Sequence, residues 1–200
     1  MSTASRAKHK LCRRIGQCLW HDPKCPSGKR PYPAGPHGKN RRAKLSTYGA
    51  LLQEKQKLRG FYGISEKQLR IAYQKAKSGS GQAGDKLFQS LESRLDAVVY
   101  RAGFAKTIFA AKQFINHGHL LVDGKKVDRS SFQVREGSVI SINAEKSPAI
   151  AEVAKSSNAV VPSYIEVDRE TLKATFVRVP AVEEIPTDVQ IMSVIEYYAR

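Results

Sequence analysis

The first ninety residues of this 200-residue chain carry the whole of its excess positive charge, which limits what that part can fold into. Residues 1–90 hold 20 Lys/Arg against 4 Asp/Glu, a net charge of +16. Residues 91–144 hold 8 against 5, and residues 145–200 hold 6 against 9. Like charges at this density repel one another in a compact fold, so they indicate a polyanionic partner. Nucleic acid is the partner class that the distribution favours most.

Length and apolar content allow one or two modest domains with a real core. Of the 200 residues, 41% are apolar, which is well above the content of disordered chains. No run approaches the ~20 apolar residues of a membrane-spanning helix, and Met1–Arg6 lacks the apolar segment of a secretory signal. A membrane-surface protein would need an amphipathic helix opposite its cations, and residues 1–44 show none. We therefore expect a cytoplasmic protein with no membrane partner.

Residues 1–44 form a basic arm in which we expect no regular structure. Between Ser2 and Lys44 there are twelve Lys/Arg, a single Asp and many Gly and Pro. Such a composition cannot build a helix or bury a core by itself. The arm therefore needs another means of holding its shape.

All three cysteines lie in this arm and suggest that means. With His9 they form the pattern His9-x2-Cys12-x5-Cys18-x6-Cys25, which places four zinc-type ligands within seventeen residues. We predict one structural zinc as the anchor of the arm, with His21 as a substitute ligand. The alternative is three reduced thiols in a loop without metal, because the x5 spacing departs from the usual CxxC pair. The odd cysteine count argues against structural disulfides.

Residues 45–90 have the periodicity of a helical domain. Ser46 is a good N-cap for a first helix, which Gly60 and Gly63 should end. Ser65 and Gln68 form a capping box for a second helix. Residues 79–84 match the GxGxxG pattern of dinucleotide sites, but a helix rather than a strand precedes them, so we expect a flexible connector there.

Residues 91–144 predict a small α+β domain of two short helices on a short sheet. The apolar spacing predicts a helix that starts at Asp85 and continues to Gly103, followed by a helix capped by Thr107. Asp123-Gly124 predicts the type I′ turn of a β-hairpin, and residues 139–142 alternate like a strand. Residues 145–200 add strands near 164–167 and 175–179 and a helix near 191–198, and we expect this segment to pack on the helical domain.

Several motifs in residues 91–125 resemble a known RNA-binding module. The segments are Leu91–Ala105, Gln113–His119 and Val122–Lys125. They resemble the small domain named after ribosomal protein four of the small subunit. The resemblance therefore implies an RNA-binding domain inserted between the helical segment and the tail.

The resemblance to the family of ribosomal protein four extends through most of the chain. Arg30–Gly38, Glu54–Arg59, Tyr62–Glu66 and Ile195–Tyr198 are similar to further family segments, in the same order. The cysteines resemble those of zinc-binding members, although His9 stands where those members carry cysteine. Several ordered matches over about 170 residues are more specific than any single motif.

Membership in that family implies a structural constituent of the small ribosomal subunit rather than an enzyme. It implies a primary binder of small-subunit ribosomal RNA that nucleates assembly at a multi-helix junction in the five-prime domain. It also implies the third and fifth small-subunit proteins as partners, a place near the channel through which messenger RNA enters, and support of translational accuracy.

The residues expected to contact RNA are cations, polar side chains and one glycine of the arm, the helical domain and the small domain. Cations can neutralise phosphates of several converging RNA helices, and Tyr or His can stack or donate hydrogen bonds. The residues are Arg13, Arg14, Arg30, His37, Gly38, Arg41, Arg42, Lys55, Lys57, Arg59, Tyr62, Arg94, Arg101, Lys106, Lys112, Gln113, His117, His119 and Lys125.

Other protein classes use the same small domain. Pseudouridine synthases and some tRNA synthetases carry it beside a catalytic domain, and no segment of this chain is left to form one. A zinc-dependent DNA binder would need a recognition helix after the cysteines, which the sequence lacks. The alternative that stays open is a free stress factor that binds ribosomes. Stoichiometric retention on salt-washed ribosomes separates an integral component from such a factor.

Overall fold

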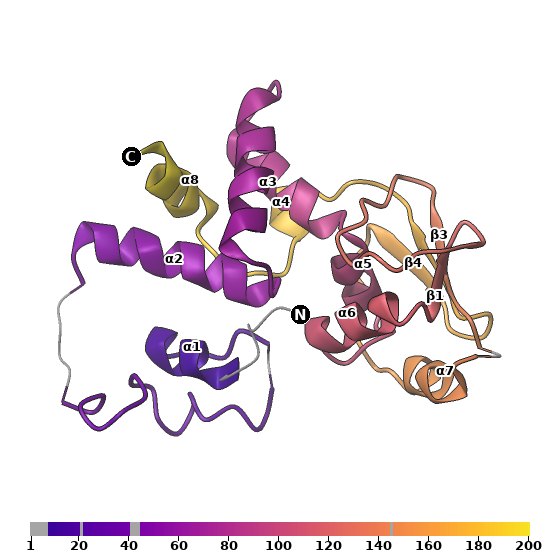
Figure 1. The fold of residues 1–200 in the computed structure, drawn as a ribbon, viewed down its shortest axis with the longest axis horizontal. Coiled ribbons are helices and arrows are strands. Elements are labelled where there is room, and N and C mark those ends of the chain that lie inside the picture. Colours follow the sequence, from indigo (N-terminus) through magenta and orange to yellow (C-terminus); the bar gives the residue numbers. More distant parts are fainter. Residues whose placement is uncertain (1–7, 21, 41–44, 145) are drawn as a thin grey trace. The chain divides into compact units, whose positions relative to one another are not determined.

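A computed structural model of the chain describes residues 8–20, 22–40, 45–144 and 146–200. The chain forms two compact units, in the elements that Figure 1 labels. Unit 1 combines Met1–Lys75 with Asp188–Arg200, and unit 2 is the intervening segment Ala76–Thr187. Unit 2 is thus an insertion in the sequence of unit 1. The predicted α+β class, with a small domain inserted into a helical one, is confirmed.

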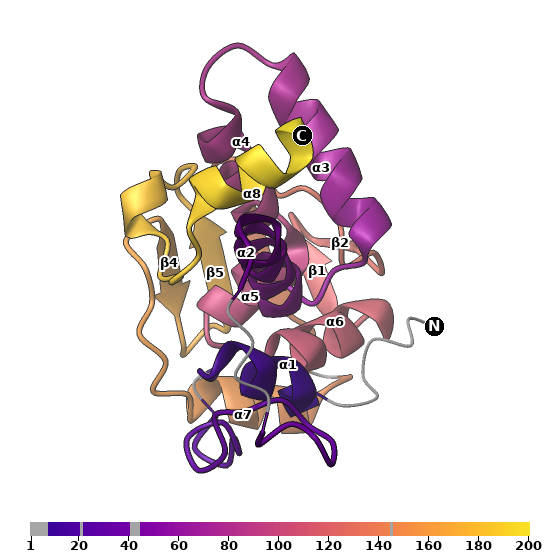
Figure 2. The same ribbon diagram turned by 90° about the vertical axis from the view of Figure 1, so that its left-hand side faces the viewer.

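Unit 1 is helical, and the polar caps expected from the sequence are formed. Ser46 Oγ accepts a hydrogen bond from Gly49 N at 3.2 Å. Ser65 and Gln68 exchange the two bonds of a capping box. Helix α8 packs against α2, as Figure 2 shows with α2 seen end-on. The helices are α1 (Lys8–Ile15), α2 (Thr47–Phe61), α3 (Glu66–Ser78, which ends beyond the boundary of unit 1) and α8 (Ile191–Ala199).

The arm differs from the expectation in one respect, because it contains the helix α1. Cys12 and Leu19 are buried. A β-carbon added to Gly60 of α2 would lie 2.4 Å from Leu11 Cδ2 and 3.0 Å from Leu19 Cδ1, so these side chains pack directly on the α2 backbone. The composition of the arm cannot sustain a helix alone, but tertiary packing supplies what propensity lacks.

Unit 2 is built on an antiparallel sheet in the order β2-β1-β3-β5-β4. Helices α5 and α6 cover one side of it (Figure 1), and apolar residues of these helices form one core with those of the strands. The strands are β1 (Leu120–Val122), β2 (Lys125–Lys126), β3 (Val139–Ile142), β4 (Ile165–Asp168) and β5 (Lys173–Phe176). The helices are α4 (Ala83–Glu92), α5 (Leu95–Arg101), α6 (Ile108–Asn116), α7 (Pro148–Lys155) and the 3-10 turn η2 (Val182–Glu184).

The turn between β1 and β2 has the predicted type I′ conformation. Asp123 and Gly124 have φ values of 50° and 77°, so both central residues are left-handed. Asp123 Oδ1 also accepts a hydrogen bond from Val139 N at 2.8 Å. The side chain of the turn therefore ties the hairpin to the start of β3.

The single helix predicted from Asp85 to Gly103 is wrong, because the chain leaves the helix at residues 93–94. Arg94 has an extended backbone (φ −71°, ψ 140°) and forms a β-bridge with Gln133. The carbonyl of Ser93 accepts a hydrogen bond from Val134 N at 2.8 Å. Apolar spacing continues through the break, so periodicity alone cannot show it. The backbone pairing with residues 133–134 divides the segment into α4 and α5.

The tail, expected as one piece on the helical domain, is shared between the two units. Strand β5 pairs with β3 and β4 pairs with β5, so both strands extend the sheet of unit 2. Helix α7, which lies in an Ala/Ser-rich stretch without a predicted element, contributes Ile150, Ala151 and Ala154 to the same core. Within the tail, the part in unit 1 is Asp188–Arg200. No described helix is long and apolar enough to cross a bilayer.

A buried ion pair links α4 and α5 with the residue that precedes β4. Glu92 is fully buried, and the side chain of Arg101 is 9% exposed. Arg101 Nη2 donates to Glu92 Oε1 at 2.8 Å, and the hydroxyl of Tyr164 donates to Glu92 Oε2 at 3.1 Å. Burial, followed by the charge of Glu92, raises the pKa of Tyr164 above its ordinary value. The tyrosine therefore stays a neutral donor to the carboxylate.

Arg101→Ala should lower the free energy of unfolding by about 3–5 kcal/mol, because it leaves a fully buried carboxylate without its guanidinium. Tyr164→Phe removes one hydrogen bond to a charged group and should cost about 1.5–3 kcal/mol. Urea unfolding of the full chain, followed by circular dichroism, measures both. The matched control is Arg135→Ala, an exposed arginine of the same unit, which should change stability by less than about 0.5 kcal/mol. Equal values for Arg101→Ala and the control would contradict the role of the pair.

Candidate nucleic-acid interface and metal centre

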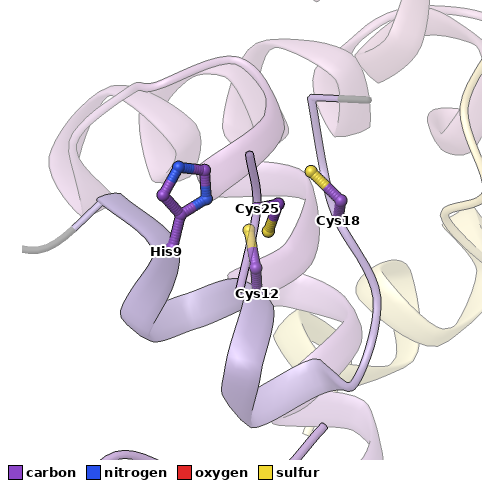
Figure 3. A group of neighbouring side chains, drawn as sticks. All are labelled: His9, Cys12, Cys18 and Cys25. Carbon is purple, nitrogen blue, oxygen red and sulfur yellow. The ribbon is translucent and has the colours of Figure 1, made fainter. Parts of the chain in front are cut away.

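The four predicted metal ligands come together in the arm. His9 and Cys12 lie on α1, and Cys18 and Cys25 follow in the loop (Figure 3). One potential ligand atom of each lies within 4.8 Å of those of the other three. Zn–S bonds of about 2.3 Å place the sulfurs of a tetrahedral site about 3.8 Å apart. The four atoms are therefore nearly spaced for one ion, and His21, the proposed substitute, lies outside the described residues.

The two ring nitrogens of His9 have different surroundings. Nε2 lies 3.4 Å from Asp22 Oδ2. Nδ1 is buried and has no hydrogen-bond partner among the described residues. Figure 3 shows Nδ1, the nitrogen next to the bond to Cβ, on the side of the ring that faces Cys12 and Cys25. A buried polar atom without a partner is costly in a protein, and a metal ion at this place would satisfy it.

The thiols differ in their tendency to ionise. Burial, more than any other cause, raises the pKa of Cys12 to about 12. Burial also acts to raise the pKa of Cys25, but hydrogen bonds from the hydroxyl and backbone of Ser27 and from the other two thiols lower it more. The pKa of Cys25 therefore lies below its ordinary value. A cation in the cluster would displace the remaining thiol protons, so the donor set of three sulfurs and one imidazole fits structural zinc.

The cluster is connected to α2 through Trp20. The Trp20 indole N–H donates to the carbonyl of Phe61 at 3.3 Å, and its ring meets the ring of His9 edge-on at a centroid distance of 6.1 Å. The same end of α2 carries Gly60, on which Leu11 and Leu19 pack. The segment that carries the four candidate ligands is thus in direct contact with the C-terminal end of α2.

Arg13 organises the rest of the arm. Its guanidinium donates to the carbonyls of Tyr32 (3.2 Å) and Pro33 (3.3 Å) and lies 5.0 Å from the centroid of the Tyr32 ring. Gly38 N donates to Gly35 O, and a β-carbon on Gly38 would lie 1.9 Å from the Pro33 carbonyl oxygen. Gly38 therefore permits close backbone packing within the arm. Gly38 was among the residues expected to contact RNA, but its amide is already bonded inside the turn.

Three of the residues expected to bind RNA in the helical domain are buried within unit 1. Lys55 is 4% exposed, lies 2.9 Å from Glu66 Oε1 and sits 4.3 Å from the centroid of the Tyr197 ring. Lys57, 7% exposed, donates to the carbonyl of Asp188. Tyr62 is 1% exposed and belongs to the core. These side chains hold the helices together and present little surface to a partner.

Two arginines and one lysine of the small domain are likewise occupied in its fold. Arg94 makes a bidentate contact with the buried Asp96, at 2.8 and 3.0 Å. Arg101 pairs with Glu92, as described above. Lys112 Nζ lies 3.5 Å from Asp96 Oδ2, and burial lowers the pKa of Lys112 despite that carboxylate.

The remaining described residues of the expected set are accessible, and each unit has its own group. Arg59 and His119 are half-buried. Arg13 is also half-buried and is engaged in the arm. Arg41 and Arg42 lie outside the described residues. The exposed members are Arg14, Arg30 and His37 in unit 1 and Lys106, Gln113, His117 and Lys125 in unit 2.

In unit 2, Gln113, His117 and Lys125 belong to the C-terminal end of α6 and to the hairpin, whereas Lys106 precedes the N-terminal end of α6. The rings of His117 and His119 are 5.9 Å apart. A β-carbon on the intervening Gly118 (φ 73°) would lie 2.1 Å from Lys126 Cε, so Lys126 extends across this turn. Lys126 was not among the residues expected to bind RNA. Because Lys126 directly follows Lys125 in the hairpin, the sequence could have identified it as a further candidate RNA contact.

Comparisons with known proteins cover the whole chain. Residues 4–92 match the family described as Ribosomal protein S4/S9 N-terminal domain, and residues 93–140 match the S4 domain. The small ribosomal subunit protein uS4 of Brucella abortus (strain S19) is 47% identical over the full length of both chains. The uS4 proteins of Ruegeria sp. (strain TM1040) and Bartonella henselae are 45% and 48% identical over the same full lengths. The chain belongs to the uS4 family.

Membership in the uS4 family confirms the resemblance to ribosomal protein four seen in the sequence. The family consists of structural ribosomal proteins and not of enzymes. The S4 domain begins at residue 93, in the short non-helical segment between α4 and α5. The buried contacts of Arg94 and Arg101 thus form near the start of this RNA-binding module.

Gly38→Ala should open the turn of residues 33–38, because the new methyl group would overlap the backbone carbonyl of Pro33. A steric cost of about 1–3 kcal/mol predicts amide exchange roughly 10-fold faster or more at residues 35, 37 and 38. Hydrogen exchange measured by NMR tests this. Gly28→Ala is the matched control in the same arm, since its β-carbon would have no neighbour within 4 Å. Unchanged exchange in Gly38→Ala would show that the turn does not depend on this contact.

Proposed function

We propose that the chain is a structural constituent of the small ribosomal subunit that binds its ribosomal RNA directly. The full-length similarity to uS4 proteins is the observation that carries this proposal. The charge distribution supports it independently, because the net charge of +16 on residues 1–90 needs a polyanion for neutralisation. A cytoplasmic place within the ribosome follows from this role.

The proposed interface consists of the accessible cations and polar groups in both units. In unit 1 these are Arg14, Arg30 and His37, together with the predicted Arg41 and Arg42. In unit 2 they are Lys106, Gln113, His117, Lys125 and the newly found Lys126. Separate groups on two units suit an RNA junction, where several backbones converge and are recognised by shape. The buried Lys55, Lys57, Tyr62, Arg94 and Arg101 support this surface from within.

We further propose that binding occurs early in assembly, at a multi-helix junction in the five-prime domain of the RNA. The third and fifth small-subunit proteins would be neighbours near the channel through which messenger RNA enters, where the chain would support translational accuracy. The resemblance to the family suggests these partners. The full-length similarity favours a ribosomal role over that of a free stress factor, because the similarity extends beyond the S4 domain that such factors share.

We also propose that one structural zinc ion is held by His9, Cys12, Cys18 and Cys25. The spacing of their ligand atoms supports this assignment, as does the buried Nδ1 of His9, which finds no partner within residues 8–20, 22–40, 45–144 and 146–200. When bound, zinc supplies a rigid tetrahedral cross-link for a segment with little apolar core. The residues themselves orient α1 and the loop against the end of α2.

Affinity for small-subunit RNA should fall by about 10³-fold or more between 50 and 200 mM salt, as expected if six or more phosphates are contacted. Replacing Lys106 and Lys125 with Ala should weaken binding and reduce the slope of log K against log salt by about two. Filter binding of the full chain to small-subunit RNA measures both quantities.

The matched control is the double variant Lys155→Ala and Lys173→Ala, which removes two exposed lysines of the tail in the same unit. It should leave the slope unchanged. If both double variants changed the slope equally, net charge rather than the proposed surface would control binding. Salt-independent binding would contradict the electrostatic interpretation as a whole.

The purified chain should contain about one zinc ion, and chelation should change the fluorescence of Trp20, the only tryptophan in the sequence. This follows because Trp20 contacts both His9 and the end of α2. Cys18→Ser should lose most of the metal, and zinc affinity should weaken at low pH because the ligands must release protons. Elemental analysis and fluorescence measure these effects. His37→Ala, in the same arm, should retain zinc; a zinc-free wild-type chain from zinc-replete cells would refute the assignment.

A further inference from the structure

Asp22 contacts three of the four residues of the metal centre, although it is not itself one of the expected ligands. Its carboxylate Oδ2 lies 3.4 Å from His9 Nε2. Its backbone N–H donates to Cys18 Sγ at 3.3 Å, and its carbonyl accepts from Cys25 N at 2.9 Å. It is also the only acidic residue in the first 53 positions. The side chain and the backbone of one residue therefore converge on the cluster.

The two nitrogens of His9 require this carboxylate if the ring is to bind a metal. Nδ1 faces the sulfurs and is buried, with no partner in the described part of the chain, so it is the nitrogen available to an ion (Figure 3). A nitrogen that binds a metal carries no proton, so in the neutral ring the proton lies on Nε2. Nε2 then donates toward Asp22. Carboxylates in this position commonly orient metal-binding histidines and increase their basicity.

We propose that Asp22 is a positioning residue of the metal centre, whose carboxylate holds the proton on His9 Nε2 and so presents Nδ1 to the ion. The inference rests on the proposed zinc site. It explains how one histidine can serve as the fourth ligand beside three cysteines. A cysteine thiolate has no N–H group and needs no carboxylate to orient it. An imidazole that lacks such a carboxylate can rotate or adopt the other tautomer.

The carboxylate has a second contact that a test must separate from this role. Asp22 Oδ1 accepts a hydrogen bond from Lys24 N at 3.0 Å, which shapes the turn before Cys25. Asp22→Asn retains an oxygen for Lys24 N but replaces the acceptor facing His9 with an amide nitrogen. The backbone contacts with Cys18 and Cys25 stay in place in this variant.

The decisive experiment compares Asp22→Asn in two backgrounds, the wild-type chain and the His9→Cys chain. Competition with a chromophoric chelator measures the zinc affinity of each full-length protein. In the wild-type chain, Asp22→Asn should weaken zinc binding by about 10- to 100-fold. In the His9→Cys chain the same substitution should weaken it at least ~10-fold less, because the thiolate does not use the carboxylate.

A second readout is independent of affinity. In the zinc-loaded wild-type chain, ¹⁵N NMR should show the His9 proton on Nε2 with slow solvent exchange, and Asp22→Asn should accelerate that exchange. Circular dichroism identifies any variant that fails to fold, and the NMR measurement on the wild-type chain then decides. Equal weakening in both backgrounds, or a proton on Nδ1, would overturn the inference and leave the zinc site intact. Absence of zinc from the wild-type chain would refute the site, and with it this role of Asp22.

Discussion

The few carboxylates of the chain determine which of its many cations can enter the fold. A buried cation is tolerated only when an opposite charge and hydrogen bonds compensate for the water it loses. Glu66 pairs with Lys55 and Arg59, and in unit 2 Glu92 and Asp96 pair with Arg101 and Arg94. Cations that have such a partner support the architecture. Other cations of the described residues, such as Arg14, Arg30 and Lys106, are exposed at the surface, where a polyanion can reach them.

This division explains why the sequence was sufficient to predict the RNA-binding region from its charge density, but not the role of each lysine or arginine. The excess in residues 1–90 and the motifs of the small domain were enough to predict an RNA-binding ribosomal protein. Whether Lys55 or Arg101 faces solvent depends on a carboxylate that the fold places beside it. Lys55 and Glu66 are eleven residues apart on different helices. Nothing in the local sequence of either indicates the pairing.

Local structure, in contrast, was predictable from the sequence because it depends on contacts between residues that are close in the chain. The caps at Ser46 and Thr107 and the type I′ turn at Asp123-Gly124 depend on neighbouring backbone groups, and all formed as expected. The break between α4 and α5 depends on residues 133–134, about forty positions away. Four candidate ligands within seventeen residues predicted a cluster that the fold does bring together, but nothing in the sequence singled out Asp22, whose carboxylate the fold places beside His9.

The His/Cys cluster of the arm and the C-terminal end of α2 are joined by direct contacts. Leu11 and Leu19 pack on Gly60, and Trp20 donates to the carbonyl of Phe61, so the segment that holds the ligands also covers the end of α2. An ion that binds the folded arm better than the unfolded arm stabilises the folded arm by mass action. Part of that stabilisation must reach α2 through these contacts. A basic arm without a large core can thus present its cations in a fixed arrangement before RNA neutralises them, which reduces the ordering cost of binding.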